Sequence, residues 1–220
     1  MLGIVVAAGE YDPPRRLGEW RQRAGFVVAA NGGAAHAARM GLPPNLIVGD
    51  MDSLPEEVRW EMVAAGAMRQ RHRPDKDETD TELAMRAAVD RGCDELVILC
   101  ALGGRLDHSL ANILLLALPG LEDRALLAAG DTEVRLIATE GSFSGAPGDI
   151  LSLLPLGTDV RGIWTEGLQY ALADGALRLG HARGVSNVFT QPRARVTIGE
   201  GRLLAVHIRK SGGSWESTDG

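Results

Sequence analysis

The chain has 220 residues, 45% of them apolar, which is enough for one large or two small folded domains with a sizeable core. Its 23 Lys and Arg residues against 29 Asp and Glu give a formal net charge of −6, and no sustained basic block interrupts the sequence. This composition excludes an intrinsically disordered chain and argues against nucleic acid as a partner, while a small anionic ligand held by a cation stays compatible with it.

The N-terminal stretch MLGIVVAAGE carries no positively charged leader and is too short to cross a membrane, so it is interpreted as a first strand. Cys93 and Cys100 lie in or beside an apolar segment and lack metal-ligand spacing, which favours buried free thiols in a reducing compartment. We therefore expect a soluble, cytoplasmic protein without a membrane partner.

Up to about residue 127, short apolar runs alternate with helical patterns. Strands are expected at 2–8, 26–30, 45–49, 67–72 and 95–101, and helices at 15–25, 34–41, 55–66, 81–92 and 109–118. Val-, Ile- and Leu-rich strands that alternate with helices indicate parallel βαβ units covered on both faces. Residues 1–127 are thus predicted to form an α/β domain with a doubly wound, mostly parallel sheet.

Beyond residues 124–131 the helical period disappears. Short strand-like stretches follow at 132–138, 149–156, 176–182, 193–198 and 202–208, and the last two alternate well around a Gly-Glu-Gly turn. Residues 128–210 are predicted to form a small all-β domain, a sandwich or a barrel, and the polar, Gly/Ser-rich residues 211–220 a flexible tail.

The stretch VGDMDSL places Asp50 and Asp52 directly after a predicted strand. Ligands of parallel α/β sheets bind outside the carboxyl ends of the strands, and residues i and i+2 of an extended segment point the same way. The two carboxylates can therefore converge on one cation. The alternative interpretation is that Asp52 or Ser53 only caps the next helix while Asp50 is solvated.

A second acidic cluster precedes the helix predicted at 81–92. Its members are Asp75, Asp77, Glu78 and Asp80, and the helix dipole accounts for only one or two of them. Since this loop opens at the same sheet edge as Asp50, the gathered carboxylates would repel one another unless a divalent cation offset their charge. Ligation by oxygen atoms alone suits Mg²⁺. A calcium-stabilised structural loop is another interpretation, although the EF-hand spacing is absent.

Two Gly-rich turns lie at predicted strand ends, ANGGAAHAA with Gly32 and Gly33, and LGGRLDHSLAN. The second contains Gly103, Gly104, Arg105, Asp107 and His108. Backbone N–H groups at such helix starts can receive a phosphate, although a tight strand-to-helix turn calls for the same residues. Neither turn matches the P-loop or the dinucleotide fingerprint, so a nucleotide would bind in another way.

The ordered motifs ANGGA, PPNLIVGDMDS, DKDETDTELAM, GGRLDHSLANI and GLQYAL…GVSNVF resemble the thiamine pyrophosphokinase family over nearly the whole chain. The resemblance implies an α/β catalytic domain followed by a β-sandwich domain, working as a homodimer with the thiamine sites at the subunit interface. It also implies ATP as co-substrate and Mg²⁺ as cofactor. Such an enzyme transfers the pyrophosphoryl group of ATP to the hydroxyl of thiamine, giving thiamine diphosphate and AMP.

The resemblance also implies roles for single residues. Asp50, Asp52 and Asp80 match the magnesium-binding aspartates, and Asp80 is a candidate for orienting the thiamine hydroxyl or accepting its proton. Asp77 matches an acidic position of the same loop, and Arg105 completes the implied catalytic set. The segments that the family uses around the nucleotide and its phosphates contain Asn31, Gly32, Gly33, Gly104, Arg105, Asp107 and His108.

In the second domain, Ser186 and Asn187 match the thiamine-contacting serine segment. Tyr170 falls at an aromatic position, where its face suits a flat cationic thiazolium or an aminopyrimidine, and ordinary strand packing is the alternative.

Three positions depart from the family pattern. Asn31 stands where the family has Asp, so a charge is lost while hydrogen bonding is retained; Met51 replaces Phe, and Gln169 replaces Lys. Two other functions remain open at this point. The chain could pyrophosphorylate another small alcohol, such as a hydroxymethylpterin, or it could bind nucleotide or thiamine without catalysis, with Asn31 as a mark of lost activity.

Overall fold

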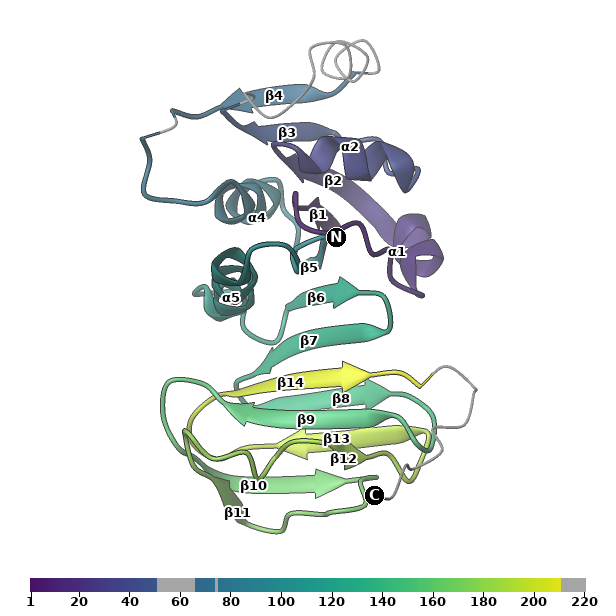
Figure 1. Cartoon of the computed structure of the whole chain (residues 1–220), viewed down its shortest axis with the longest axis vertical. Coiled ribbons are helices and arrows are strands. Elements are labelled where there is room, and N and C mark those ends of the chain that lie inside the picture. The colour runs from purple at the N-terminus through teal and green to yellow at the C-terminus, as the bar shows by residue number, and fades with distance from the viewer. Residues whose placement is uncertain (51–65, 74, 211–220) are drawn as a thin grey trace. The chain divides into compact units, whose positions relative to one another are not determined.

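The structure is a computed structural model that describes residues 1–50, 66–73 and 75–210 (Figure 1). Its class is α/β, with a large mixed sheet and a second sheet that has four strands among the described residues. The chain divides into two compact units, one of residues 1–130 with 134–136, the other of residues 131–133 with the chain from residue 137 onward. Within the described ranges, no helix has the length and apolar character needed to cross a membrane.

The first unit is built on parallel strands. They are β1 (Leu2–Val6), β2 (Ala24–Ala30), β3 (Leu46–Gly49), β4 (Met68–Arg71), β5 (Glu95–Leu99) and β6 (Ala125–Ala129), in the spatial order β6-β5-β1-β2-β3-β4. Each of these neighbouring strands pairs in the parallel sense. Their carboxyl ends therefore lie at one edge, where the loops that carry the acidic and Gly-rich motifs begin.

Helices flank these strands on both sides. They are α1 (Leu17–Arg23), α2 (Gly33–Arg39), α4 (Asp80–Asp90) and α5 (Leu106–Leu114), with a 3₁₀ turn η1 (Leu115–Ala117) after α5. Figure 1 shows α1 and α2 on one side of the strands and α4 and α5 on the other. Strands β1 and β3 are buried along their whole length, as expected of a sheet with both faces covered.

Most predicted elements of this unit are present, with shifted ends. The helix predicted at 109–118 begins earlier, at Leu106, and continues as the 3₁₀ turn after Leu114. The weak strand predicted at 67–72 is β4, whose four side chains are all exposed. The helix predicted at 55–66 falls outside the described residues except for its last position.

The second unit consists of antiparallel strands. Its strands are β8 (Glu140–Ser144), β9 (Ile150–Pro155), β10 (Val160–Glu166), β11 (Gly175–Leu177), β12 (Asn187–Val188), β13 (Arg193–Thr197) and β14 (Leu203–Ile208), and β7 (Thr132–Ile137) is divided between the two units. One group has the order β12-β9-β14 and the other β11-β10-β13-β8. Side chains of both groups, among them Leu151, Ile163, Val196 and Ala205, form a single apolar cluster, so the unit is a two-layer sandwich.

Two of these strands, β8 and β10, have no clear sequence signal. Strand β10 shifts register between Arg161 and Ile163, and Gly162 between them has φ +64°, so the alternation of side chains is interrupted. In β8, which reads EGSFS, only Phe143 is buried. A strand of this kind is stabilised by its neighbours rather than by its own composition.

A histidine is buried beside a carboxylate in the second unit. His207 is 1% exposed, its Nε2 lies 3.2 Å from Oδ2 of Asp149, and its ring stacks on Phe189 with the centroids 4.9 Å apart. Asp149 also accepts hydrogen bonds from the backbone N–H groups of Ala146 and Lys210, both at 2.9 Å. The pair thus ties the end of β14 to the turn before β9.

Burial lowers the pKa of His207, and the nearby positive charge of Arg209 lowers it further, which outweighs the opposing effect of Asp149. Burial acts to raise the pKa of Asp149, but the two backbone donors and His207 together lower it below its usual value. The arrangement therefore favours a neutral imidazole beside an ionised carboxylate.

Because the pKa of His207 in the folded protein lies below the reference value of 6.5, the unfolded chain binds this proton first as the pH falls. We predict that the contribution of His207 to the free energy of unfolding is largest above pH 6.5 and decreases as the pH falls below that value. In a His207→Gln variant, the free energy of unfolding measured by urea denaturation should change less with pH between about pH 5 and 8. His181→Gln, at an exposed histidine, is the matched control and should keep the wild-type slope; an unchanged slope in His207→Gln would contradict the assignment.

Candidate active site

The carboxyl ends of β1, β2, β3 and β5 open into one cavity of about 620 Å³. Its lining comprises residues 7–10 after β1, 30–32 after β2, 50 after β3, 76 and 78–81 at the start of α4, and 101, 103–105, 108 and 112 around the start of α5. The acidic loops and both Gly-rich turns therefore contribute to the same cavity, as their positions at strand ends predict.

The polar centre of this cavity is formed by Asn31, Asp50 and Asp80. The Nδ2 atom of Asn31 donates to Oδ1 of Asp50 at 2.7 Å and to Oδ2 of Asp80 at 3.2 Å. The other carboxylate oxygen of Asp80, Oδ1, lies 2.5 Å from Nζ of Lys76. Two carboxylates from different parts of the sequence thus converge on one amide.

The backbone at the end of β3 allows this convergence because residue 49 has no side chain. A Cβ atom on Gly49 would lie 2.9 Å from Cβ of Asn31 and 3.2 Å from Cγ of Asp80, and its φ of +147° disfavours other residues. Asn31 itself has φ +45°, a left-handed conformation that Asn adopts more readily than most residues. Its N–H donates to the carbonyl oxygen of Val48 at 2.8 Å, which fixes the turn to β3.

Asp80 is held by the start of α4. The Thr79 side chain accepts a hydrogen bond from the N–H of Glu82 at 3.1 Å, which caps the helix and makes Asp80 its first residue. The Glu82 carboxylate accepts hydrogen bonds from Arg86 at 2.8 and 3.0 Å. The first helical turn therefore directs only one of its two carboxylates to the amide of Asn31.

The turn before α5 is stabilised by side chains of its own unit. The N–H of Gly103 donates to Oγ of Ser109 at 3.1 Å, and the N–H of Gly104 donates to Oε1 of Glu10 at 3.2 Å. On the surface, Arg105 donates to both oxygens of Asp107, and this hydrogen bonding lowers the pKa of Asp107. The carboxylate of Glu10 thus occupies the backbone donor of Gly104.

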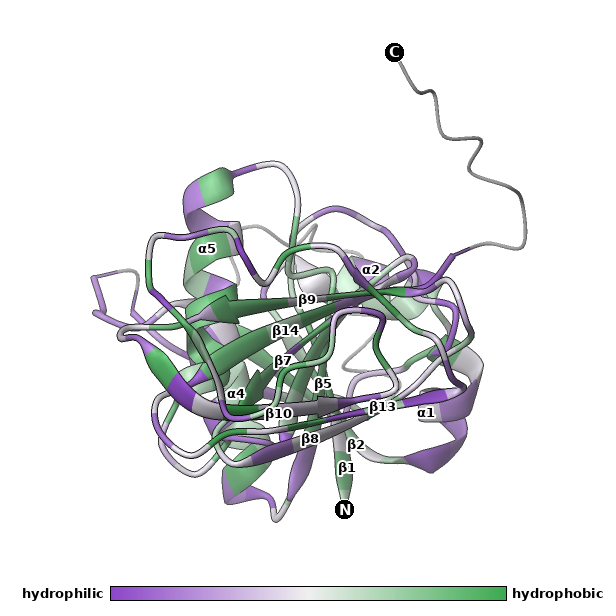
Figure 2. Ribbon diagram, turned by 90° about the horizontal axis from the view of Figure 1, so that it is seen from below, coloured by the Kyte–Doolittle hydropathy of each residue, from purple (hydrophilic) through white to green (hydrophobic). Residues whose placement is uncertain are grey.

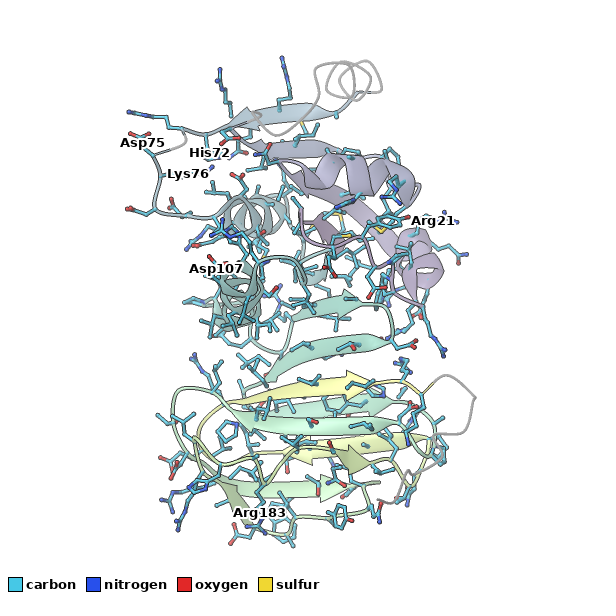
Figure 3. The ribbon with its side chains drawn as sticks, viewed as in Figure 1. Arg21, His72, Asp75, Lys76, Asp107 and Arg183 are labelled. Atoms are coloured by element: carbon cyan, nitrogen blue, oxygen red, sulfur yellow. The ribbon has the colours of Figure 1, made fainter. Side chains whose placement is uncertain are left out.

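Seven of the predicted site residues line the cavity: Asn31, Gly32, Asp50, Asp80, Gly104, Arg105 and His108. Gly33, Asp77 and Asp107 are not part of this lining. Asp52 lies outside the described residues. Figure 3 shows that Lys76 and Asp107 lie on the side of the unit that carries α4 and α5.

The sequence interpretation missed several lining residues, of which Lys76, Glu10 and Asn112 have the clearest partners. Lys76 stands between two aspartates in DKDETD, and this position marked it as the nearest cation to the acidic loop. Glu10 follows the end of the first strand, so the strand order alone could have predicted its place at the cavity, where it accepts from Gly104. Asn112 donates to the carbonyl oxygen of Ala101 at 2.8 Å and shows no pattern in the sequence.

The donor atoms suit a hard cation. Within residues 1–50, 66–73 and 75–210, no group of three His, Cys, Asp or Glu side chains is arranged to hold a metal ion, and Asp50 with Asp80 is the acidic pair that converges. The pair offers only oxygen ligands, as Mg²⁺ prefers, and would leave coordination positions for a substrate's phosphate oxygens.

A second cavity, of about 510 Å³, lies within the sandwich unit. Its lining comprises Leu153, Gln169, Tyr170, Ala171, Leu172, Leu177, Arg183, Gly184, Val185 and Asn187. The Tyr170 side chain is largely exposed, and the Asn187 side chain accepts from the N–H of Tyr170 at 3.0 Å and donates to its carbonyl oxygen at 2.8 Å. Ser186, with φ +61°, is not in the lining, and its N–H donates to Oγ of Ser152.

Gly33 is required by the packing of α2 against the end of β1. A Cβ atom at this position would lie 2.1 Å from the carbonyl oxygen of Val6 and 2.8 Å from that of Ala7. We predict that Gly33→Ala lowers the free energy of unfolding by about 1–3 kcal/mol, measured by urea denaturation. Gly18→Ala on α1 is the matched control, since nothing lies within 4 Å of the added atom; equal stability of the two variants would contradict the prediction.

Comparison with known proteins agrees with the motifs. The description "Thiamin pyrophosphokinase, catalytic domain" matches residues 18–125, and "Thiamin pyrophosphokinase, vitamin B1 binding domain" matches residues 137–203. The thiamine pyrophosphokinase of Bacillus subtilis (strain 168) is 26% identical over 213 residues, covering 92% of this chain and 96% of that protein. Thiamine pyrophosphokinase 1 of Arabidopsis thaliana is 28% identical over 190 residues, covering 81% and 70%.

Solved structures share the fold. The crystal structure of thiamine pyrophosphokinase from Bacillus subtilis superposes with a TM-score of 0.85 at 23% identity, covering 96% of this chain and 100% of that one. A thiamin pyrophosphokinase family protein from Enterococcus faecalis superposes with a TM-score of 0.84 at 25% identity and the same coverage. Because the two domain matches together span most of the chain, at residues 18–125 and 137–203, the chain belongs to the thiamine pyrophosphokinase family.

Proposed function

We propose that this chain is an ATP:thiamine diphosphotransferase, which transfers the pyrophosphoryl group of ATP to the hydroxyl of thiamine and releases AMP. The observation that carries the proposal is the convergence of Asp50 and Asp80 at a cavity that also contains Lys76 and Arg105. Positioning and charge neutralisation dominate such phosphoryl transfers, and this set of side chains supplies both. The names of the bacterial and plant relatives favour thiamine over a hydroxymethylpterin and over a binding-only role.

In this proposal Asp50, Asp52 and Asp80 would hold Mg²⁺ in the doubly wound first unit. When bound, the ion would neutralise charge on the phosphate oxygens of ATP. The described carboxylates fit it, because both are oxygen donors and both are turned to the same amide. Asp77 would add negative charge to the same loop.

The remaining residues of the cavity would bind the nucleotide. Arg105 would present a planar guanidinium to the phosphates. Its ion pair with Asp107 is exposed, so Arg105 can leave Asp107 for a phosphate at little cost in free energy. Asn31, Gly32, Gly104 and His108 line the same cavity, and Gly33 lets α2 approach the strand ends. Lys76, which is paired with Asp80 in the structure, would contact the phosphates of ATP once a metal ion had bound to Asp80.

The reaction needs one proton acceptor. The hydroxyl oxygen of thiamine would attack the β-phosphorus of ATP, the bond from that phosphorus to the bridging oxygen of AMP would break, and AMP would leave with that oxygen. We assign the hydroxyl proton to Asp80, whose carboxylate lies at the cavity wall.

Thiamine would bind with the sandwich unit. The exposed ring of Tyr170 offers a face to a flat heterocycle, and Asn187 fixes the backbone of Tyr170 through two hydrogen bonds. Ser186 stands in the same segment, beside Asn187. The match of residues 137–203 to a vitamin B1 binding domain supports this assignment.

The proposal is completed by a homodimer in the cytoplasm, with thiamine sites at the subunit interface. Self-association is supported by an apolar stripe on α5, a helix without a buried residue, where Leu106, Leu110 and Leu114 are 73%, 53% and 54% exposed. Figure 2 colours much of this helix as hydrophobic. Leucines at four-residue spacing form one helix face, and a contiguous exposed apolar face marks a protein contact.

We predict that Asp50→Asn and Asp80→Asn each reduce turnover by at least about 100-fold with the fold intact, because each removes a charge that orders the phosphates. AMP and thiamine diphosphate are quantified by chromatography after incubation with ATP, Mg²⁺ and thiamine, with EDTA and no-thiamine controls. Asp90→Asn, at the exposed far end of α4, should retain wild-type turnover.

Near-normal turnover of either cavity variant would remove that residue from the cation site. Folded wild-type protein that binds ATP but forms neither product would instead point to another acceptor alcohol or to a binding role.

We also predict that Leu110→Glu converts a dimer into a monomer in sedimentation velocity, since a buried carboxylate in the contact has no partner. Val89→Glu, at an exposed apolar residue of α4, is the matched control and should remain dimeric. A dimer that tolerates Leu110→Glu would exclude the α5 face as the contact.

A further inference from the structure

Asn31 is buried, and its amide lies between the two carboxylates of the proposed cation site. The side chain is 7% exposed, and the single atom Nδ2 donates to Asp50 at 2.7 Å and to Asp80 at 3.2 Å. The two aspartates belong to different elements, because Asp50 follows β3 and Asp80 begins α4. Asn31, at the end of β2, is therefore a hydrogen-bonded link between them.

The side-chain amide of Asn31 carries no charge. Two carboxylates that approach one another repel, and the repulsion must be offset by donors or by cations. In the structure, Oδ2 of Asp80 receives the amide of Asn31, and Oδ1 receives the ammonium of Lys76, whose side chain is 15% exposed. A third carboxylate at position 31 would keep the shape of the side chain but would add repulsion where the amide now donates.

The backbone holds the amide in place from both sides. The N–H of Asn31 donates to Val48 of β3, and the carbonyl oxygen of Asn31 accepts from the N–H of Ala34 at 3.1 Å. The φ of +45° suits Asn, Asp and Gly, so each of these residues can occupy the position without a change of the turn. Substitution at residue 31 therefore tests the side chain rather than the backbone.

We propose that Asn31 is a positioning residue that holds the carboxylates of Asp50 and Asp80 convergent and limits the negative charge of the site. The metal-free protein is thereby stabilised, and free Mg²⁺ binds less tightly than it would to a site with a carboxylate at position 31. The phosphates of ATP would then supply much of the cation's ligation, in the manner of sites that combine one or two carboxylates with substrate oxygens. This inference rests on the cation site of the proposed function.

The test compares wild type with Asn31→Asp, which adds a charge at constant shape, and Asn31→Gly, which removes the amide at constant backbone conformation. Thermal unfolding is measured in EDTA, and Mg²⁺ binding is measured by calorimetry without nucleotide. Gln70→Glu, an amide-to-acid exchange on the exposed edge strand β4, is the matched control for added charge.

We expect Asn31→Asp to melt below wild type in EDTA and to bind Mg²⁺ more tightly, so that Mg²⁺ restores its stability. Asn31→Gly should weaken Mg²⁺ binding by roughly ten-fold or more, the usual effect of removing a partner of a metal ligand. Gln70→Glu should match wild type in both measurements. Asn31→Asp that melts at or above wild type in EDTA, or Asn31→Gly with unchanged Mg²⁺ affinity, would overturn the proposal.

A double-variant cycle separates this inference from the proposed function. In EDTA, Asn31→Gly should lower the stability of the wild-type protein more than it lowers the stability of the Asp80→Asn variant. In that variant the interaction partner of Asn31 is already altered. Additive losses would overturn the positioning role even if the protein binds Mg²⁺. Wild-type protein that binds no Mg²⁺, with or without ATP, would overturn the cation site itself, whatever the cycle gives.

Discussion

The approach of two carboxylates at the end of a parallel sheet is the constraint on which the first unit depends. Asn31 donates to both Asp50 and Asp80, and the missing side chain of Gly49 leaves room for all three side chains. Thr79 fixes the start of α4 at Asp80, and the bare backbone of Gly33 lets α2 pack on β1. Local conformations at the ends of β2 and β3 and at the start of α4 thus bring two negative charges to one hydrogen-bond donor.

In the sandwich unit, polar side chains instead form hydrogen bonds that fix the backbone of loops. Asn187 uses both ends of its amide to hold the backbone of Tyr170, and Asp149 gathers two backbone N–H groups and His207 in the interior. These contacts leave the ring of Tyr170 exposed on a fixed backbone. A ligand that binds by ring stacking needs this kind of rigid, accessible face.

Much of this arrangement could be predicted from the sequence, because strand ends of a parallel sheet share one edge. That rule placed Asp50, Asp80 and both Gly-rich turns in one cavity. It could not predict that Gly104 would be bonded to Glu10, a contact across 94 positions of the chain, or that one amide would bridge two aspartates. Strand β10 escaped prediction because a bulge at Gly162 breaks the pattern that identifies strands.

The proposed function requires that the Asp50 and Asp80 carboxylates form a cation site. This can be examined in crystals grown with an ATP analogue and Mn²⁺, an anomalous scatterer that shares the oxygen preference of Mg²⁺. We expect one anomalous peak within coordinating distance of both the Asp50 and the Asp80 carboxylates, with phosphate oxygens completing the ligation. A peak that contacts neither aspartate, or nucleotide bound in the cavity with Mn²⁺ elsewhere, would contradict it.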